Sequence, residues 1–146
     1  GIEAPVVSPF WQAWSGGTNL LLPRNDTEWD NMTALLYSRP PHIPGFARRE
    51  ALRTLRDDRD DLERIFAGLL ADGHNPLGDS LHRITCPVTV IWGEEDRVMD
   101  PSGAGVVRDA LPSAYIHMLD GCGHSPTRER PDEVGRILLN VISRWG

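Results

Sequence analysis

The sequence predicts an α/β fold, because its last third alternates strand-like and helical segments. Residues 87–92 and 114–119 are short apolar runs, which are typical of buried parallel strands. Each run is followed by a helical segment, at 102–111 and 131–145, and the order strand, helix, strand, helix is the pattern of α/β proteins. Residues 81–146 are therefore expected to form two βα units.

The first 80 residues carry no clear strand pattern and are expected to be mainly helical. Residues 1–24 are rich in Gly, Pro and Trp without a clear periodicity, which predicts a packed, irregular segment. Residues 25–73 predict about three short helices. Thr27, with Asp30 three residues later, is the expected cap of the first of these helices.

Apolar spacing and turn residues set the expected limits of the other helices. Two more are expected over residues 46–55 and from Asp60 or Asp61 to Gly73. The last helix is expected to begin at Pro131, a residue type that suits a first helical turn. Its apolar side chains form one stripe, which consists of Val134, Ile137, Leu138, Val141, Ile142 and Trp145.

Composition places the chain among ordinary globular proteins and argues against several function classes. Of its 146 residues, 40% are apolar and 25% are charged, which suits one domain or a piece of one. The net charge of −6 and the lack of a basic stripe argue against a nucleic-acid partner. No apolar run of about 18 residues is present, so no membrane-spanning helix is expected. Two cysteines, Cys86 and Cys122, are too few for a disulfide framework, and free thiols in a reducing, cytoplasmic compartment are favoured.

Two parallel strands do not make a stable sheet alone, because a parallel sheet needs several strands and cover on both faces. Residues 81–146 are therefore expected to be the edge of a larger sheet, and the chain to be a fragment of a longer protein. Any targeting signal would then lie upstream of Gly1.

Two candidate catalytic residues follow the two predicted strands. Asp96 comes after Gly93, which permits a tight turn at the end of the first strand. His124 lies in the loop after the second strand, and histidine is the side chain that exchanges a proton near neutral pH. The carboxyl ends of parallel strands meet at one edge of a sheet, so both side chains are expected to face the same crevice. An acid followed by a histidine is also the chain order of the last two members of a Ser-Asp-His triad.

Each of these two residues also has a plainer interpretation. Asp96 could be a solvated loop acid, because other acids lie beside it, and a loop histidine is often structural. No serine of the chain occurs in a Gly-x-Ser-x-Gly motif, so the nucleophile of a triad is missing. Neither a metal nor an organic cofactor is expected. The histidines that show no metal-ligand spacing and are interpreted as structural are His42, His74, His82 and His117.

Residues 91–100 resemble the acid loop of the α/β-hydrolases, and residues 121–124, with 129–131, resemble their histidine loop. Residues 16–19 and 37–44 resemble the lid region of the monoacylglycerol lipase branch of that fold. The similarity extends over nearly the whole chain, but it covers only the C-terminal half of the family's fold.

The resemblance implies a helical lid, or cap, over residues 1–80, followed over residues 81–146 by the C-terminal βαβα portion of the hydrolase core. It implies that Asp96 is the triad acid and His124 the general base, while the serine lies upstream in the missing N-terminal half of the core. The implied activity of the parent protein is hydrolysis of a carboxylic ester, with a monoacylglycerol or a similar lipophilic ester as substrate. Without the serine, the chain alone is predicted to be inactive.

The resemblance to a lipase lid also suggests what the lid contacts. A peripheral membrane contact through its basic residues is one expectation, which the aspartates that follow them oppose. These basic residues are Arg48, Arg49, Arg53 and Arg56. Some apolar side chains of the lid are candidates for the wall of an acyl-binding pocket, although they could serve in helix packing alone. The candidates are Trp29, Met32, Leu36, Phe46 and Phe66.

Two other functions stay open at this point. The same acid and histidine loops serve haloalkane dehalogenases, epoxide hydrolases and C–C bond hydrolases, and the nucleophile upstream would distinguish these from an esterase. The second alternative is a non-catalytic binding module that keeps a degenerate hydrolase fold. A stable, cooperatively melting isolated chain would favour it.

Overall fold

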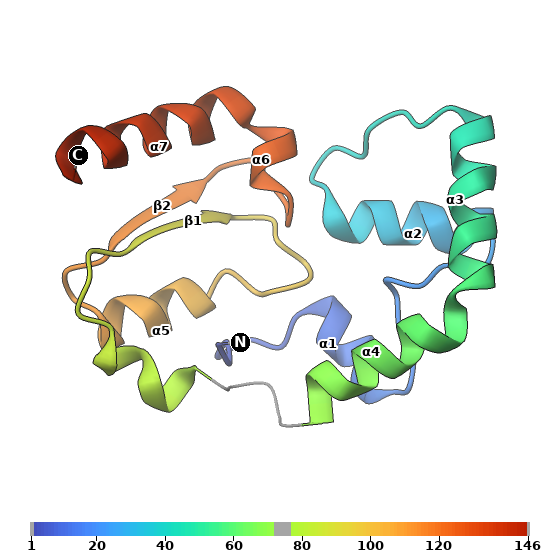
Figure 1. The fold of residues 1–146 in the computed structure, drawn as a ribbon, viewed down its shortest axis with the longest axis horizontal. Helices are drawn as coiled ribbons and strands as arrows, with labels where there is room; N and C mark the ends of the chain where they lie inside the picture. The colour runs from blue at the N-terminus through green and yellow to red at the C-terminus, as the bar shows by residue number, and fades with distance from the viewer. Residues whose placement is uncertain (1, 72–76, 146) are drawn as a thin grey trace.

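The computed structural model describes residues 2–71 and 77–145 of the chain (Figure 1). Gly73, the expected end of a helix, and His74 lie outside the described residues. The first elements are α1 (Pro9–Ser15), α2 (Asp26–Leu36), α3 (Gly45–Asp57), α4 (Arg59–Ala71) and a 3₁₀ helix, η1 (Gly78–Arg83). They are followed by β1 (Thr89–Gly93), α5 (Gly103–Ala110), β2 (Tyr115–Leu119), α6 (Pro126–Glu129) and α7 (Pro131–Trp145).

The two strands form a parallel pair. Thr89 pairs with Tyr115 at one end of the pair, and Gly93 pairs with Leu119 at the other. The connecting helix α5 covers one face of the strands, while α7 lies across the other face (Figure 1). The α/β class and the order of elements expected for residues 81–146 are therefore confirmed.

Each face of the strand pair has its own apolar core. The buried cluster on the α7 side consists of Leu119, Cys122, Val134 and Ile137, with Ile91 packed against it. The buried cluster on the α5 side consists of Leu81, Val107 and Leu111, joined by half-buried residues of both strands. Because the two strands are parallel and end at paired residues, Gly93 and Leu119, the loops after β1 and β2 leave the sheet side by side.

The apolar stripe predicted for α7 is only partly covered by the described residues. Val134 and Ile137 are buried, whereas Leu138 and Ile142 are 48% and 65% exposed. The strand pair beneath the helix is narrow, so the outer half of the stripe finds no partner there. Neither α7 nor any other described helix is long and apolar enough to cross a membrane.

Helix α1 lies within the segment that was expected to be irregular, so that prediction was wrong for part of residues 1–24. Ser8 caps the helix, because its Oγ accepts a hydrogen bond from the Trp11 N–H at 3.3 Å, and Pro9 supplies the first helical position. Phe10 then packs into a buried cluster with residues of α2 and of the loop after β1. A helix of seven residues is too short to show a periodic pattern, so only its cap could have revealed it.

The cap predicted at Thr27 is wrong, since the cap of α2 is Asn25, two residues earlier. The Asn25 Oδ1 atom accepts from the Glu28 N–H at 2.9 Å, and the Glu28 carboxylate accepts from the Asn25 amide at 2.9 Å. The second carboxylate oxygen of Glu28 accepts from the Arg24 N–H at 2.8 Å. Asn25 and Glu28 thus bond to each other reciprocally, in a variant of the capping box in which Glu28 accepts the N–H of Arg24 in place of that of the cap residue.

Replacing Ser8 by alanine is expected to lower the free energy of unfolding by about 1–2 kcal/mol. The buried hydroxyl caps α1 and also donates to the Val98 carbonyl at 2.7 Å, so the substitution leaves a buried acceptor without its partner. Urea denaturation followed by circular dichroism measures the change. Ser15→Ala, at the exposed end of the same helix, is the matched control, and equal effects of the two substitutions would contradict the cap.

Candidate active site

Asp96 lies just after β1, in a turn that its own side chain closes. The Asp96 N–H donates to the Gly93 carbonyl at 3.3 Å. Its Oδ1 atom accepts hydrogen bonds from the backbone N–H groups of Val98, at 2.8 Å, and Met99, at 2.9 Å. These bonds fix the orientation of a side chain that is 5% exposed, and they leave Oδ2 for a different partner.

That partner is His124, whose Nδ1 atom lies 2.9 Å from Asp96 Oδ2. The prediction that the two loops bring these side chains together is confirmed, while their catalytic role stays a prediction. An ionised carboxylate only accepts hydrogen bonds, so Nδ1 carries the proton and Nε2 keeps a free lone pair. The imidazole is 36% exposed against 5% for the carboxylate, so the pair presents its base, and not its acid, to the surroundings.

A cavity of about 210 Å³ lies beside the imidazole. Among the described residues, no hydrogen bond reaches the Nε2 atom of His124. The imidazole can therefore accept a proton from a group placed in the cavity, and the carboxylate would stabilise the imidazolium that forms. The lining consists of Ile91, Trp92, Gly93, Asp96, Met99, His124 and Pro126.

The pair forms because the acid and histidine loops touch at their backbones. A Cβ atom at Gly93 would lie 2.2 Å from the carbonyl oxygen of Gly123 and 2.3 Å from that of Cys122. The Cys122 carbonyl also accepts the Glu95 N–H at 2.9 Å. Only glycine fits at position 93, at the end of β1, because any side chain there would push the acid loop and the histidine loop apart.

Residues 36–38, which belong to the predicted lid, contact the histidine loop from another side. The His124 N–H donates to the Leu36 carbonyl at 2.9 Å, and a Cβ atom at Gly123 would lie 2.8 Å from the Ser38 nitrogen. The carboxylate of Glu129, from α6, accepts from the N–H groups of Gly123 and Ser38. No role was predicted for Glu129 from the sequence. The one available signal was its place in the run that resembles a histidine loop.

Cys122 lies two positions before His124 but does not serve as a substitute nucleophile. The side chain is fully buried. Burial, together with the nearby Glu129 carboxylate, raises the pKa of the Cys122 thiol to about 11. The thiolate is the reactive form of cysteine, and a thiol with this pKa stays protonated at neutral pH.

The candidate pocket residues of the lid do not line the cavity beside the imidazole. Trp29 is buried, and Leu36 packs against the apolar cluster around α1. Phe66 lies near a tryptophan of α1, with 6.2 Å between the ring centroids. Met32 is half-buried, while Phe46 is 71% exposed. The role of these five residues in substrate binding stays a prediction.

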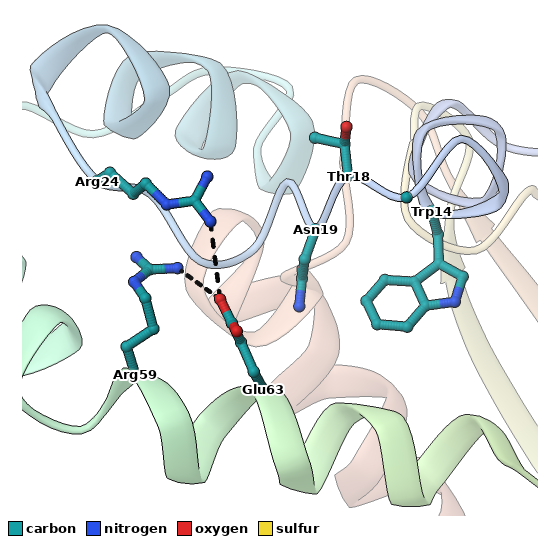
Figure 2. A pocket seen from close by; sticks show the side chains of 7 residues that line it. Trp14, Thr18, Asn19, Arg24, Arg59 and Glu63 are labelled. Carbon is teal, nitrogen blue, oxygen red and sulfur yellow. Dashed lines mark hydrogen bonds and ion pairs between the residues drawn. The ribbon is translucent and has the colours of Figure 1, made fainter.

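A second cavity, of about 440 Å³, lies in the predicted lid. Arg24 and Arg59 both approach one oxygen of Glu63, at 3.7 Å and 3.2 Å (Figure 2). The charged groups of this second cavity are therefore largely engaged with one another. The second cavity shares no residue with the cavity beside the imidazole. The Asp96–His124 pair is thus the better candidate for a catalytic site. The lid cavity is lined by Trp14, Gly17, Thr18, Asn19, Arg24, Arg59 and Glu63.

Known proteins resemble this chain in both sequence and structure. A profile of the Alpha/beta hydrolase family matches residues 2–137. A monoacylglycerol lipase of Xenopus laevis is 28% identical over 128 residues, which make up 84% of this chain and 37% of the frog protein. A monoacylglycerol lipase of Homo sapiens is 30% identical over 67 residues, 46% of this chain and 20% of the human protein. The crystal structure of a membrane phospholipase A, a bacterial virulence factor, matches 98% of this chain and 46% of its own, with a TM-score of 0.89 and 24% identity.

These relatives are all longer than the chain, which spans less than half the length of each. The structural match at 24% identity shows a common fold and no more. The profile match extends over most of the chain and includes both the acid loop and the histidine loop. The chain therefore belongs to the Alpha/beta hydrolase family.

Proposed function

We propose that the chain is part of a serine hydrolase that cleaves carboxylic esters, with His124 as general base and Asp96 as the acid that orients it. The observation that carries the proposal is the 2.9 Å contact between His124 Nδ1 and Asp96 Oδ2, with Nε2 left for a proton. The family match and the presence of lipases among the relatives support it.

In the proposed reaction, a serine outside this chain attacks the ester carbonyl as Nε2 of His124 takes the hydroxyl proton. The carbonyl oxygen becomes an oxyanion, which backbone N–H groups outside this chain would hold. The intermediate collapses to an acyl-enzyme, and the imidazolium gives its proton to the departing alcohol. Water then attacks the acyl-enzyme, and Nε2 takes a proton from the water and returns it to the serine as the carboxylic acid is released. Asp96 keeps Nδ1 protonated throughout, so that only Nε2 exchanges protons.

The proposed substrate is a monoacylglycerol or a similar lipophilic ester. Sequence relatives at 28% and 30% identity are named monoacylglycerol lipases, and this supports the choice of ester. The walls of the cavity beside the imidazole are largely apolar, with Ile91, Trp92 and Met99 among them. Apolar walls favour a substrate that brings an apolar chain to the reacting carbonyl.

We also propose that the missing N-terminal half of the hydrolase core covers the open edge of β1 and supplies the serine. Within the described residues, β1 pairs only with β2, so its other edge presents unpaired N–H and C=O groups. A cavity of about 560 Å³ with mainly apolar walls lies between β1 and α7. Both features suit a further strand with an apolar face. The cavity is lined by Pro87, Thr89, Ile91, Leu138 and Val141.

The isolated 146-residue chain is expected to show no turnover of a short-chain ester such as p-nitrophenyl butyrate. Loss of the nucleophile of a triad costs about a million-fold in kcat. The same chain, expressed together with the reading frame that precedes Gly1, is expected to hydrolyse the ester. Release of p-nitrophenol measures both results.

His124→Ala in the longer polypeptide provides the control and is expected to abolish its turnover. Turnover by the isolated chain that His124→Ala abolishes would contradict the proposal that the serine lies elsewhere. An aspartate at the nucleophile position, found by sequencing the preceding codons, would instead indicate dehalogenase or epoxide hydrolase chemistry.

A further inference from the structure

Glu129 joins two parts of the chain that are far apart in sequence. Its Oε1 atom accepts the Gly123 N–H at 2.8 Å, beside the imidazole in the histidine loop. Its Oε2 atom accepts the Ser38 N–H at 2.7 Å and lies 3.4 Å from the Arg39 nitrogen, both in the lid. One carboxylate on the short helix α6 is therefore shared between the loop that carries His124 and the segment that follows α2.

The two joined segments also contact each other directly. The His124 N–H donates to the Leu36 carbonyl at 2.9 Å. Gly123 leaves no room for a side chain, because a Cβ atom there would lie 2.8 Å from the Ser38 nitrogen and 2.9 Å from the Leu36 oxygen. Ser38 in turn reaches the acid loop, since its Oγ donates to the Glu95 carboxylate at 2.8 Å. Residues 36–39 thus form a strut between the acid loop and the histidine loop.

Only a carboxylate can serve both ends of this junction. Each Glu129 oxygen faces a backbone N–H group, and an acceptor is needed at both positions. Glutamine would present one oxygen and one NH₂ group, so one backbone donor would face another donor. Whichever way the amide is turned, the N–H of Gly123 or that of Ser38 loses its acceptor, and the loss is costliest at Gly123, which is buried.

We propose that Glu129 is a positioning residue for the proposed ester hydrolysis: it fixes the backbone that carries His124 to residues 36–39 of the lid. This inference rests on the proposed function, because positioning has a catalytic meaning only if His124 is the base. Glu129 itself does not touch the reacting atoms. It acts through the Gly123 N–H, one residue before the imidazole, and a small displacement there moves Nε2 relative to a serine that is held elsewhere.

Glu129→Gln tests the inference in the ester-hydrolysing polypeptide described above. We expect kcat to fall about tenfold to a hundredfold, while KM changes less than about twofold, because geometry and not substrate binding is lost. Active-site titration with a fluorophosphonate corrects for the folded fraction. Glu94→Gln is the matched control, because Glu94 is exposed and its side chain makes no hydrogen bond or ion pair among the described residues. The kcat of the Glu94→Gln variant should equal that of the wild type.

Ser38→Ala separates the two contacts of the lid segment. This variant loses the hydroxyl bond to Glu95 but keeps the backbone N–H that Glu129 accepts. Its kcat is expected to stay within about threefold of the wild-type value. A loss in Ser38→Ala as large as that in Glu129→Gln would overturn the assignment to Glu129.

Proton NMR gives a reading that a merely structural role would not move. The Nδ1–H of His124, bonded to Asp96, should give a low-field resonance, and Glu129→Gln should shift or broaden it in the folded protein. Glu94→Gln should leave it in place. This signal requires no substrate, so it still tests positioning if ester hydrolysis itself is not found.

An unchanged Nδ1–H resonance and an unchanged kcat per titrated site in Glu129→Gln would overturn the proposal, even if the melting temperature falls. Should Glu129→Gln fail to fold, Glu129→Asp is the second variant, because it keeps the charge on a shorter arm. A positioning role predicts a shifted resonance and a reduced kcat in folded Glu129→Asp. A wild-type Nδ1–H resonance together with a wild-type kcat in folded Glu129→Asp would overturn the proposal.

Discussion

Replacing Asp96 by asparagine is expected to lower kcat for ester hydrolysis about ten-thousandfold in the polypeptide that carries the serine. Asparagine keeps an oxygen for the N–H groups of Val98 and Met99, so the turn after β1 persists. Its other polar atom becomes an amide nitrogen, which donates where Oδ2 accepted. The imidazole of His124 then accepts at Nδ1 and carries its proton on Nε2. A base that is already protonated cannot take the proton of the serine.

Initial rates at saturating ester measure this effect, and circular dichroism shows whether the variant is folded. Asp100→Asn is the matched control, because Asp100 caps a neighbouring turn through the Ser102 N–H at 2.9 Å and has no hydrogen bond to His124. The control should keep kcat within about threefold of the wild-type value. If Asp96→Asn retained more than about a tenth of the wild-type kcat, Asp96 would not be the orienting acid.

Replacing Gly93 by alanine is expected to lower the free energy of unfolding by about 3 kcal/mol. The new Cβ atom would lie 2.2 Å and 2.3 Å from two backbone carbonyl oxygens of the histidine loop. Backbone atoms cannot rotate aside as a flexible side chain can, so the end of β1 and the loop must separate. The same separation would pull Asp96 away from His124, so catalysis should fall together with stability.

Urea denaturation of the wild type and of the Gly93→Ala variant measures the change in the free energy of unfolding. Gly105→Ala in α5 is the matched control, because no atom lies within 4 Å of its added Cβ. Alanine there is expected to stabilise the helix by up to about 1 kcal/mol, since it removes backbone freedom from the unfolded chain. A Gly93→Ala variant as stable as the wild type would show that the two loops are not in backbone contact.

The two βα units could be predicted from sequence because local signals define them. The strands are short apolar runs, and Pro131 marks the first residue of α7 as predicted. Asp96 and His124 could be paired in advance, because parallel strands direct their following loops to one edge of the sheet. The apolar runs locate the two strands, and their parallel arrangement brings the loops that follow them together. The proximity of Asp96 and His124 follows from these two features.

The elements that were missed depend on contacts that no local pattern encodes. Helix α1 has seven residues, and it is held by the Ser8 bond to Val98, which lies 90 positions away. The cap of α2 is Asn25, whose side chain exchanges hydrogen bonds with Glu28, while the prediction weighed Thr27 with Asp30. The role of Glu129 depends on Ser38, 91 positions earlier, and no spacing rule connects them.

The hydrogen bond from the His124 N–H to the Leu36 carbonyl joins the end of α2 to the loop that carries His124. Leu35 of the same helix is buried against Phe10 and Val98. By contrast, α3 contributes only Leu52 to the buried residues that the structure describes. If the predicted lid opens to admit a substrate, we expect α3 and α4 to move and α2 to stay in place.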